Sequence, residues 1–264
     1  GSADFVEKEF MMRETRELSK KVRVISNKNT GYAGGANKAY EVTNGTYLVV
    51  MNPDVTVTKD YISLLVDACE KDSRIGAITG KILKPTPRAL ALASKRLSST
   101  HSMSKEHVDI IDTTGLLIFK NRRVVDRGQG SLDKGQFEKK EEVFGISGCL
   151  AFYRRAALED IAIPCLRRQL TNENVILSGE GSTSFSSEKE VWDADFFMYK
   201  EDIDVSWRLN LRGWKCMYEP KAIASHARGT HILKRYTDRD VLEHRKSVSP
   251  LARYYSYKNQ HLMQ

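Results

Sequence analysis

The chain has 264 residues, and a composition of 41% hydrophobic and 29% charged residues is that of a globular protein rather than a disordered one. It carries 42 Lys and Arg against 34 Asp and Glu, a formal net charge of +8, which suits an anionic partner: a nucleotide, a nucleic acid or an acidic membrane surface. No apolar run is long enough to cross a bilayer, and no secretory signal is visible at the start of the sequence.

The first 80 residues alternate helical and strand patterns, which predicts an α/β layer around a mostly parallel sheet. The apolar run Tyr47–Met51 is typical of a strand buried on both faces. Thr58 can cap the helix that follows, in which apolar residues recur at helical spacing. The expected elements are a helix over 5–20, a strand at 22–25, a glycine-rich loop over 27–35, a helix over 36–42, a strand at 47–51, a helix after Thr58 and a strand at 75–79.

The remainder of the chain is less regular. Polar stretches at 85–107 and 164–190 read as loop excursions, and Gly213 ends a helix in the position of a C-terminal glycine cap. The other expected elements are a hairpin of 116–120 and 124–125, a strand within 143–153, a short helix from Arg154, a helix over 200–211, strands at 215–218 and 222–225, and a helix from Ser249. We expect a main domain over 1–231 and a basic helical extension over 232–264.

Asp54 directly follows the apolar strand 47–51, in the sequence Asn52-Pro53-Asp54. In open α/β sheets, ligands bind outside the carboxyl ends of the strands, and a carboxylate there can hold a Mg²⁺ or Mn²⁺ ion that bridges phosphates. An Asp after a Pro is also common in ordinary turns, so the motif alone leaves both readings open.

The segment Asn29–Asn37 (NTGYAGGAN) combines glycines with the start of a predicted helix. Glycines let the backbone approach a ligand, and a helix N-terminus offers free N–H groups to an anion. The spacing matches neither a Walker loop nor a dinucleotide fingerprint, and a tight strand-to-helix turn explains it equally well.

Two further groups carry possible chemistry. Glu201, Asp202 and Asp204 cluster at a helix start, where the helix dipole stabilises acidic residues, but one of them could serve as a general base. The preceding Phe196–Met198 could supply an apolar wall that raises the pKa of that base. His226 follows a short strand and could be a structural residue, a metal ligand or a phosphate contact.

Together these segments resemble the inverting glycosyltransferases of family 2, which have the GT-A fold, and most of all their rhamnosyltransferase-like branch. Five blocks carry the resemblance in order, followed by the His226 segment: Asn29–Asn37, Gly45–Val55 (GTYLVVMNPDV), Asp112–Gly130 (ending DRGQG), Phe144–Arg155 (FGISGCLAFYRR) and Phe196–Gly213 (FFMYKEDIDVSWRLNLRG). The fold that this resemblance implies is a three-layer αβα arrangement with a mostly parallel central sheet.

The resemblance also implies the site. Asp202 would be the catalytic base, paired with Glu201, and a divalent metal, Mg or Mn, would be held by Asp54 and His226. The donor would be bound by Asn29, Gly31, Tyr32, Gly34, Gly35, Asn52 and Asp54, and the acceptor by Gly148, Cys149 and Trp207. Asn52 stands where the family's metal motif usually has its first Asp.

The function implied is transfer of a sugar, a deoxyhexose such as rhamnose, from a nucleotide-sugar to a glycan or polyprenyl-diphosphate-linked acceptor in bacterial surface polysaccharide synthesis. The family's opening strands, which bind the nucleobase, have no counterpart here, so we expect a chain shortened at its N-terminus and weakly active alone. A binding or assembly module, or a transferase that uses another UDP- or GDP-hexose, are the alternatives.

The cellular setting follows from the same observations. The four cysteines, Cys69, Cys149, Cys165 and Cys216, lie far apart with no Cys-x-x-Cys, so a disulfide framework or zinc knuckle is not expected and the cytoplasm fits. No RNA- or DNA-reading motif accompanies the positive charge, so nucleic acid is not an expected partner. The basic, aromatic C-terminal stretch is either a packed terminal helix or a peripheral contact with the inner face of the cell membrane.

Overall fold

The computed structural model describes residues 24–85, 109–165, 189–227 and 249–263. The predicted helix over 5–20 and the bulk of both loop excursions lie outside these ranges. The elements are α3 (Gly31–Glu41), β1 (Tyr47–Met51), β2 (Val55–Val57), α4 (Tyr61–Lys71), β3 (Ile75–Leu83), β4 (Ile111–Thr113), β5 (Leu116–Ile118), β6 (Val124–Asp126), β7 (Glu141–Val143), β8 (Leu150–Arg154), α6 (Arg155–Ile161), β9 (Ile163–Pro164), β10 (Lys189–Glu190), the 3₁₀ turn η1 (Ala194–Phe196), α7 (Glu201–Leu211), β11 (Lys215–His226) and α9 (Pro250–Leu262).

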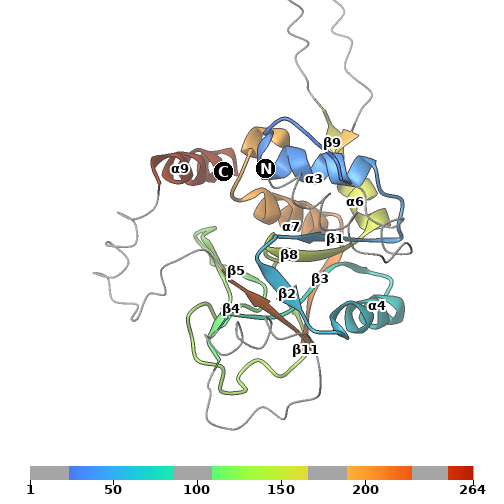
Figure 1. The fold of residues 1–264 in the computed structure, drawn as a ribbon, viewed down its shortest axis with the longest axis vertical. Coiled ribbons are helices and arrows are strands. Elements are labelled where there is room, and N and C mark those ends of the chain that lie inside the picture. The colour runs from blue at the N-terminus through green and yellow to red at the C-terminus, as the bar shows by residue number, and fades with distance from the viewer. Residues whose placement is uncertain (1–23, 86–108, 166–188, 228–248, 264) are drawn as a thin grey trace, which may run out of the picture.

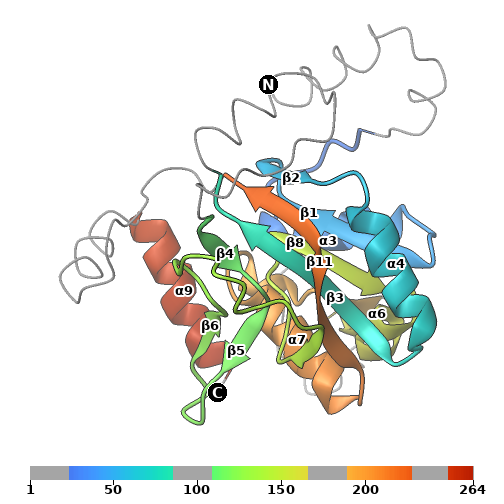
Figure 2. The ribbon, with the colours of Figure 1, turned by 90° about the horizontal axis from the view of Figure 1, so that it is seen from below.

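A seven-stranded sheet forms the middle of the molecule, with the order β1-β8-β3-β11-β2 and with β4 and β7 added to β3 and β11 (Figures 1 and 2). Among the described strands of this sheet, β3 and β11 pair in parallel, and the other neighbours pair antiparallel. Because β8 runs against both β1 and β3, the strands β1, β3 and β11 share one direction. The predicted three-layer α/β class is confirmed, with pairings that are more mixed than the sequence indicated.

The two faces of the sheet are covered by different helices. Alternate residues of a strand point to opposite faces, so Ala77 of β3 packs into a cluster with residues of α3, α6 and α7, while Ile78 packs into a cluster with residues of α4. β3 is buried along its whole length, because it has neighbours on both sides and helices on both faces. This rigid centre positions the strand ends that form the site.

The strand prediction for 47–51 is confirmed in its bounds but was wrong about its burial. β1 lies at the edge of the sheet and pairs only with β8 among the described strands, so Val49 and Met51 stay 38% and 50% exposed. An apolar run alone does not separate an edge strand from a central one, because both need hydrophobic residues on the face that packs.

Three local predictions need correction. Val24 and Ile25 form no strand, and the glycine-rich segment is already helical, since α3 begins at Gly31 rather than at Ala36. Thr58 does not cap α4, whose N-cap is Asp60; the Thr58 hydroxyl donates instead to the carbonyl oxygen of Ile223. Tertiary contacts outweigh the local signals at these positions.

The second half of the chain follows the prediction more closely. The hairpin is β5 and β6, and Gly213, at φ +81°, follows the C-cap of α7. The two short strands expected at 215–218 and 222–225 form one strand, β11, with an irregularity between Glu219 and Ile223 where its pairing to β3 shifts register. The pair β9–β10 brings the two ends of the second excursion together.

The C-terminal helix α9 packs against the turn that precedes α7, which Figure 2 shows at the side of the sheet away from α4. Asn259 is fully buried and its amide donates to carbonyl oxygens of this turn, and the ring of Tyr255 stacks on that of Phe197 with centroids 4.8 Å apart. The predicted boundary between 231 and 232 lies outside the described residues. Within the part of the chain that is described, no helix has the length and hydrophobicity needed to cross a membrane.

Candidate active site

A cleft of about 450 Å³ opens at one edge of the sheet. β1 and β11 run in the same direction, so their carboxyl ends meet there, and the antiparallel β8 begins at the same edge. The start of α7 closes the cleft from the side. The residues lining it are Tyr32, Asn52, Asp54, Asp126, Ser147, Gly148, Cys149, Met198, Tyr199, Lys200, Glu201, Asp202 and His226.

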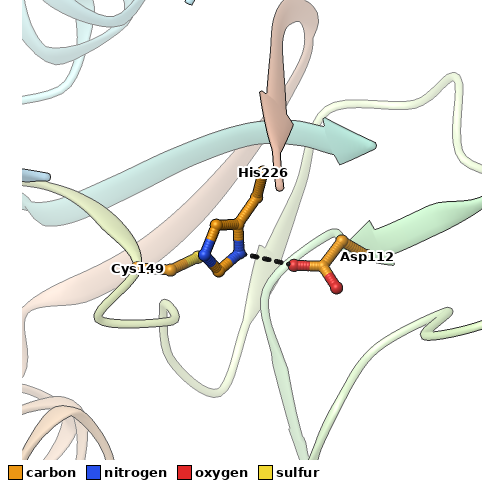
Figure 3. A group of neighbouring side chains, drawn as sticks. All are labelled: Asp112, Cys149 and His226. Carbon is orange, nitrogen blue, oxygen red and sulfur yellow. Dashed lines mark hydrogen bonds and ion pairs between the residues drawn. The ribbon is translucent and has the colours of Figure 1, made fainter. Parts of the chain in front are cut away.

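His226 is held between two carboxylates at the end of β11, and Figure 3 shows one of them, Asp112. Its Nδ1 lies 2.9 Å from Oδ2 of Asp112, which is fully buried, and its Nε2 lies 3.3 Å from Oδ1 of Asp54. A ring nitrogen of His226, the sulfur of Cys149 and a carboxylate oxygen of Asp112 lie within 4.8 Å of one another. Carboxylate, imidazole and thiolate are all metal ligands, so this group can hold a divalent cation.

Asp202 stands at the first turn of α7 and points at the chain before β8. The backbone N–H of Gly148 donates to its Oδ2 at 2.8 Å, and that of Ile203 to its Oδ1 at 2.9 Å. Burial raises the pKa of Asp202 against the opposing effect of the Gly148 hydrogen bond, and the nearby Asp126 raises it further. A carboxylate with a raised pKa in a cleft is suited to accept a proton.

The neighbouring acid, Glu201, is also perturbed. It is 6% exposed, and among its described neighbours no group hydrogen-bonds its Oε2. Burial first, and the charge of Asp202 second, raise the pKa of Glu201 to about 8. At neutral pH Glu201 is therefore mainly protonated.

Gly148 is enclosed between the two sides of the cleft. The hydroxyl of Tyr32, on α3, donates to the Gly148 carbonyl oxygen at 2.6 Å, and the raised pKa of Tyr32, due to burial and then to Asp202, keeps that hydroxyl protonated. A Cβ at Gly148 would lie 3.2 Å from the Tyr32 hydroxyl and 3.3 Å from the Cβ of Asp202. A side chain there would push Asp202 away from the Gly148 N–H.

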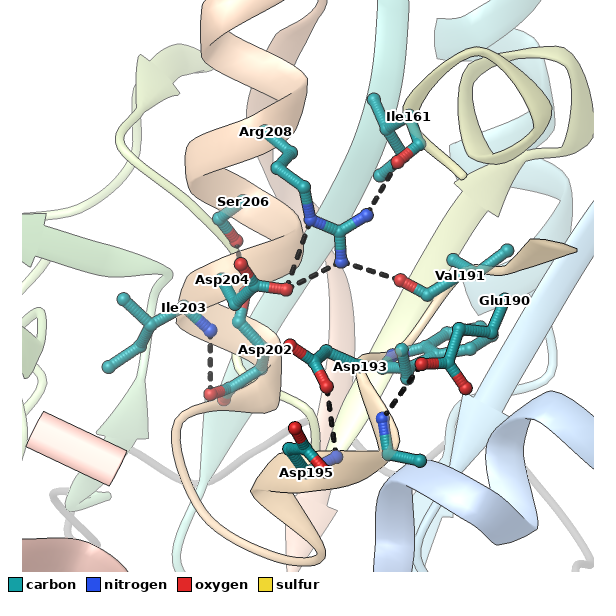
Figure 4. A network of polar contacts seen from close by, with 12 residues as sticks. Ile161, Glu190, Val191, Asp193, Asp195, Asp202, Ile203, Asp204, Ser206 and Arg208 are labelled. Atoms are coloured by element: carbon teal, nitrogen blue, oxygen red, sulfur yellow. Dashed lines mark hydrogen bonds and ion pairs between the residues drawn. The ribbon is translucent and has the colours of Figure 1, made fainter. Parts of the chain in front are cut away.

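A half-buried arginine, Arg208, fixes the helix that carries Asp202 (Figure 4). Arg208 forms an ion pair with Asp204 one turn earlier, and it donates to the carbonyl oxygens of Ile161 and Val191. The charge of Arg208 is thus matched by one carboxylate and two carbonyls. These contacts assign Asp204 to the anchoring of α7, on the side away from Asp202.

The turn before α7 has an unusual backbone. Phe197, Tyr199 and Lys200 all have positive φ, at 60°, 69° and 71°. Residues other than glycine adopt this backbone conformation only at a cost in free energy. The Phe197 carbonyl accepts a hydrogen bond from the N–H of Ala33 at 3.2 Å. The first turn of α3 is therefore docked on this turn, and that N–H is occupied by the protein itself rather than open to an anion.

Five predicted site residues do not line this cleft. The side-chain oxygen of Asn29 accepts a hydrogen bond from the N–H of Gly31. A Cβ on Gly31 would clash with the Phe197 carbonyl. Gly35 is exposed to solvent on α3. Gly34 lines a neighbouring cavity of about 750 Å³. Trp207 packs edge-on against Phe144, with ring centroids 5.6 Å apart.

Sequence reasoning missed several residues of the site. Asp112 and Asp126 lie in the block 112–130, which was noted for its resemblance and given no role. Asp112 lies within the short strand β4, for which the sequence predicts no element, and Asp126 is the last residue of β6, one position beyond the predicted strand at 124–125. Lys200, in the cleft wall, was read only as the start of a helix; burial lowers the pKa of its amine.

Comparison with known proteins identifies a family match and a similar fold. The family model described as glycosyl transferase family 2 matches residues 9–162. A solved structure, described as the crystal structure of GalNAc-T7 with UDP, GalNAc and Mn²⁺, superposes with a TM-score of 0.50 over 90% of this chain and 39% of its own, at 12% identity. At that identity the likeness concerns the fold alone, and it agrees with the GT-A-like α/β class.

Curated relatives give a second comparison. The poly-beta-1,6-N-acetyl-D-glucosamine synthases of Staphylococcus aureus strains COL and N315 are each 22% identical to this chain over 195 residues, which is 74% of this chain and 34% of theirs. The chain thus spans about a third of the length of the curated relatives it matches.

Proposed function

The chain belongs to glycosyl transferase family 2, and from this membership we propose that it transfers a sugar from a nucleotide-diphosphate donor to a glycan or lipid-linked acceptor, with inversion. The observation that carries the proposal is the pairing, in one cleft, of a half-buried carboxylate at Asp202 with the Asp54–His226 pair. Asp202 is suited to remove a proton from the acceptor, and the Asp54–His226 pair is suited to hold a cation that neutralises the leaving diphosphate. Glycosyl transfer needs both.

In this proposal Asp202 accepts the proton of the acceptor hydroxyl as that oxygen attacks the sugar. The Gly148 N–H holds one carboxylate oxygen at 2.8 Å, so the orientation of the base is set before the acceptor arrives. Glu201, largely protonated at neutral pH, adds no second negative charge. One base on one face of the sugar gives inversion in a single step.

The residues around His226 fit the divalent metal that the resemblance implies. A carboxylate oxygen and an imidazole nitrogen 3.3 Å apart, both at the cleft, form a donor pair of the kind that holds such ions. When bound, the ion supplies positive charge that stabilises the departing diphosphate. Asp54 and His226 would hold it, and the amine of Lys200 adds a second positive group to the same cleft.

The identity of the sugar rests on two different likenesses. The sequence blocks resemble the rhamnosyltransferase-like branch, which favours a deoxyhexose. The printed name of the curated relatives favours N-acetylglucosamine. The second likeness is a residue-by-residue alignment over 74% of this chain, so UDP-N-acetylglucosamine is the first donor to test and dTDP-rhamnose the second.

The decisive experiment measures thermal shifts of the chain with UDP, dTDP, GDP and CDP, each with and without Mn²⁺. We expect one nucleotide to raise the melting temperature, and to do so only with metal. The variant Asp54→Asn should lose that metal-dependent shift, whereas Asp67→Asn, an exposed acid on α4, should keep it. No shift with any nucleotide would favour the alternative, a GT-A module that binds or assembles without transferring sugar.

We also propose that the acceptor is lipid-linked and is met at an anionic membrane surface on its cytoplasmic side. Support comes from exposed apolar side chains along α9, next to basic ones: Leu251, Tyr254, Tyr257 and Leu262 are each more than half exposed. Co-sedimentation with liposomes tests this: binding that requires anionic lipid and falls in Tyr254→Ser/Tyr257→Ser supports it, and binding independent of lipid composition contradicts it.

A further inference from the structure

The β5–β6 hairpin has two different faces. Directly paired residues carry their side chains on the same face of a hairpin, and consecutive pairs alternate between the two faces. Leu116 and Asp126 form the inner pair, in which Leu116 is buried and Asp126 lines the cleft. Leu117 and Val125 form the next pair and therefore lie on the outer face, where Leu117 is 43% exposed. The solvent face of such a hairpin is usually polar, so an apolar outer face indicates a contact.

The turn between the two strands adds an aromatic ring to this outer face. Phe119 lies two positions after Leu117, on the same face, and is 47% exposed. Its N–H donates to the carbonyl oxygen of Arg123 at 2.9 Å, and its carbonyl oxygen accepts the N–H of Arg122 at 2.8 Å. The side chain of Asn121 accepts the N–H of Arg123 at 3.1 Å. The backbone that presents the Phe119 ring is therefore fixed by three hydrogen bonds.

The charge on the hairpin is of one sign. Residues 113–125 contain Lys120, Arg122 and Arg123 and no Asp or Glu, and all three basic residues are exposed. Apolar side chains bordered by Lys and Arg are typical of a surface that meets an anionic membrane, where each Lys or Arg strengthens binding by about fivefold. A nucleic acid would pair with the cations and leave the apolar side chains in water, so the pattern favours lipid.

The hairpin also connects its outer face to the cleft. Figures 1 and 2 show it on the same side of the molecule as α9 and away from α4. β6 leads from the turn to Asp126 in three residues, so at about 3.3 Å per residue the turn lies roughly 10 Å from the cleft. A sugar whose lipid carrier stays in a membrane at the turn is therefore within reach of the cleft.

We propose that the outer face and turn of this hairpin dock on an anionic lipid surface and hold the mouth of the cleft beside it. This hairpin surface consists of Leu117, Phe119 and Val125 with Lys120, Arg122 and Arg123. The inference rests on the proposed function only for the lipid-linked acceptor. It adds a second contact to the one proposed for α9, and two contacts fix the orientation of the chain, whereas one helix alone leaves rotation about its own axis free.

The test places a fluorescent side chain at the turn. We expect the emission of Phe119→Trp to move to shorter wavelength with vesicles of equal parts phosphatidylcholine and phosphatidylglycerol, and to be quenched when their acyl chains carry bromine. Vesicles of phosphatidylcholine alone should change neither. Ile62→Trp, at a position 40% exposed on α4, is the matched control and should show neither change. Circular dichroism establishes that each variant is folded, and the unaltered chain gives the background emission.

Co-sedimentation with the same vesicles measures the contribution of the charges. Lys120→Gln/Arg123→Gln should weaken binding by about 10- to 30-fold, because two cations leave the lipid surface. Lys71→Gln/Arg74→Gln removes the same charge at the end of α4 and should bind as the unaltered chain does.

Three results would overturn the docking of the hairpin. The first is an unaltered chain that does not bind the anionic vesicles. The second is a chain that binds them with no change in the emission of Phe119→Trp, or with equal affinity in Lys120→Gln/Arg123→Gln. The third is a dimer in sedimentation velocity that Phe119→Ser dissociates, which would make this surface an interface between copies of the chain.

The same variants keep this inference separate from the proposed function. If vesicle binding depends on the hairpin and no nucleotide raises the melting temperature, the docking stands and the transferase proposal fails. If a nucleotide binds with metal and vesicle binding falls only in Tyr254→Ser/Tyr257→Ser, the transferase proposal and the α9 contact stand and the docking of the hairpin fails.

Discussion

The side-chain amide of Asn259 donates to the carbonyl oxygen of Tyr199 at 2.7 Å, and so ties the last helix of the chain to the wall of the cleft. The same nitrogen lies 2.8 Å from the carbonyl oxygens of Phe196 and Met198. Three carbonyls of a turn with positive φ at Phe197 and Tyr199 therefore converge on one buried group, which offsets the strain of that backbone.

We expect Asn259→Leu to lower the free energy of unfolding by about 1–3 kcal/mol, because it leaves buried carbonyls without a donor. Urea unfolding measures this. Tyr257→Ala, two positions away on the exposed face of α9, is the matched control and should change the unfolding free energy little. Equal effects of the two substitutions would mean that Asn259 does not hold the turn.

Replacing the proposed base removes the proton acceptor and keeps its shape. Asp202→Asn should reduce kcat by about 10²- to 10⁴-fold while nucleotide binding stays close to that of the unaltered chain, since Asp202 contacts Gly148 and Ile203 rather than the cation pair. Steady-state kinetics with the donor identified by thermal shift, together with nucleotide titration, measure both quantities. Turnover unchanged in this variant would refute the assignment of the base.

Glu201 makes stability depend on pH in a defined direction. Its pKa is 4.5 in an exposed state and about 8 in the folded chain, so between these values the unfolded chain is ionised while the folded chain keeps the proton. This costs stability progressively as pH rises from about 4.5 to about 8. Glu201→Gln removes the cost, and its gain in melting temperature should be larger at pH 8 than at pH 5; an equal gain at both would contradict the raised pKa.

The glycines of α3 separate into two kinds. Gly31→Ala should be strongly destabilising, because a Cβ there would lie 2.1 Å from the Phe197 carbonyl oxygen and φ is +72°. Gly35→Ala meets no atom within 4 Å in the middle of the helix, and should stabilise the chain by about 0.5–1 kcal/mol. Chemical denaturation of both variants measures the contrast, and a destabilised Gly35→Ala would show that this face of α3 is not free.

The sequence predicts well where periodicity is long. The helices α4 and α7 have eleven residues each and both are present. The strand β3 and the hairpin β5–β6 were also predicted, from short apolar runs. The edge position of β1 was not predictable, because burial on the second face depends on which strand lies beside it. The start of α3 was missed since glycines usually end helices, and here Gly31 opens one by accommodating the Phe197 carbonyl.

Among the site residues, too, some could be predicted from the sequence and others could not. Asp54, His226 and Asp202 could be named because each stands at the end of a recognisable element, and all three line one cleft. Asp112 could not, because its contact with His226 spans 114 positions in sequence and arises from the pairing of β4 with β3. Trp207 was named from its place in a motif, whereas its helical position turns it toward Phe144.

The contacts of Arg208 allow the segment between Ile161 and Val191 to change in length during evolution. Its guanidinium donates to the carbonyl oxygens of Ile161 and Val191, which stand at the two ends of the excursion that β9 and β10 close. Lengthening the stretch between such anchors costs only about 0.6 kcal/mol for each doubling. That stretch can therefore gain, lose or exchange residues, and with them new recognition, while Asp202, the proposed base on α7, keeps its place.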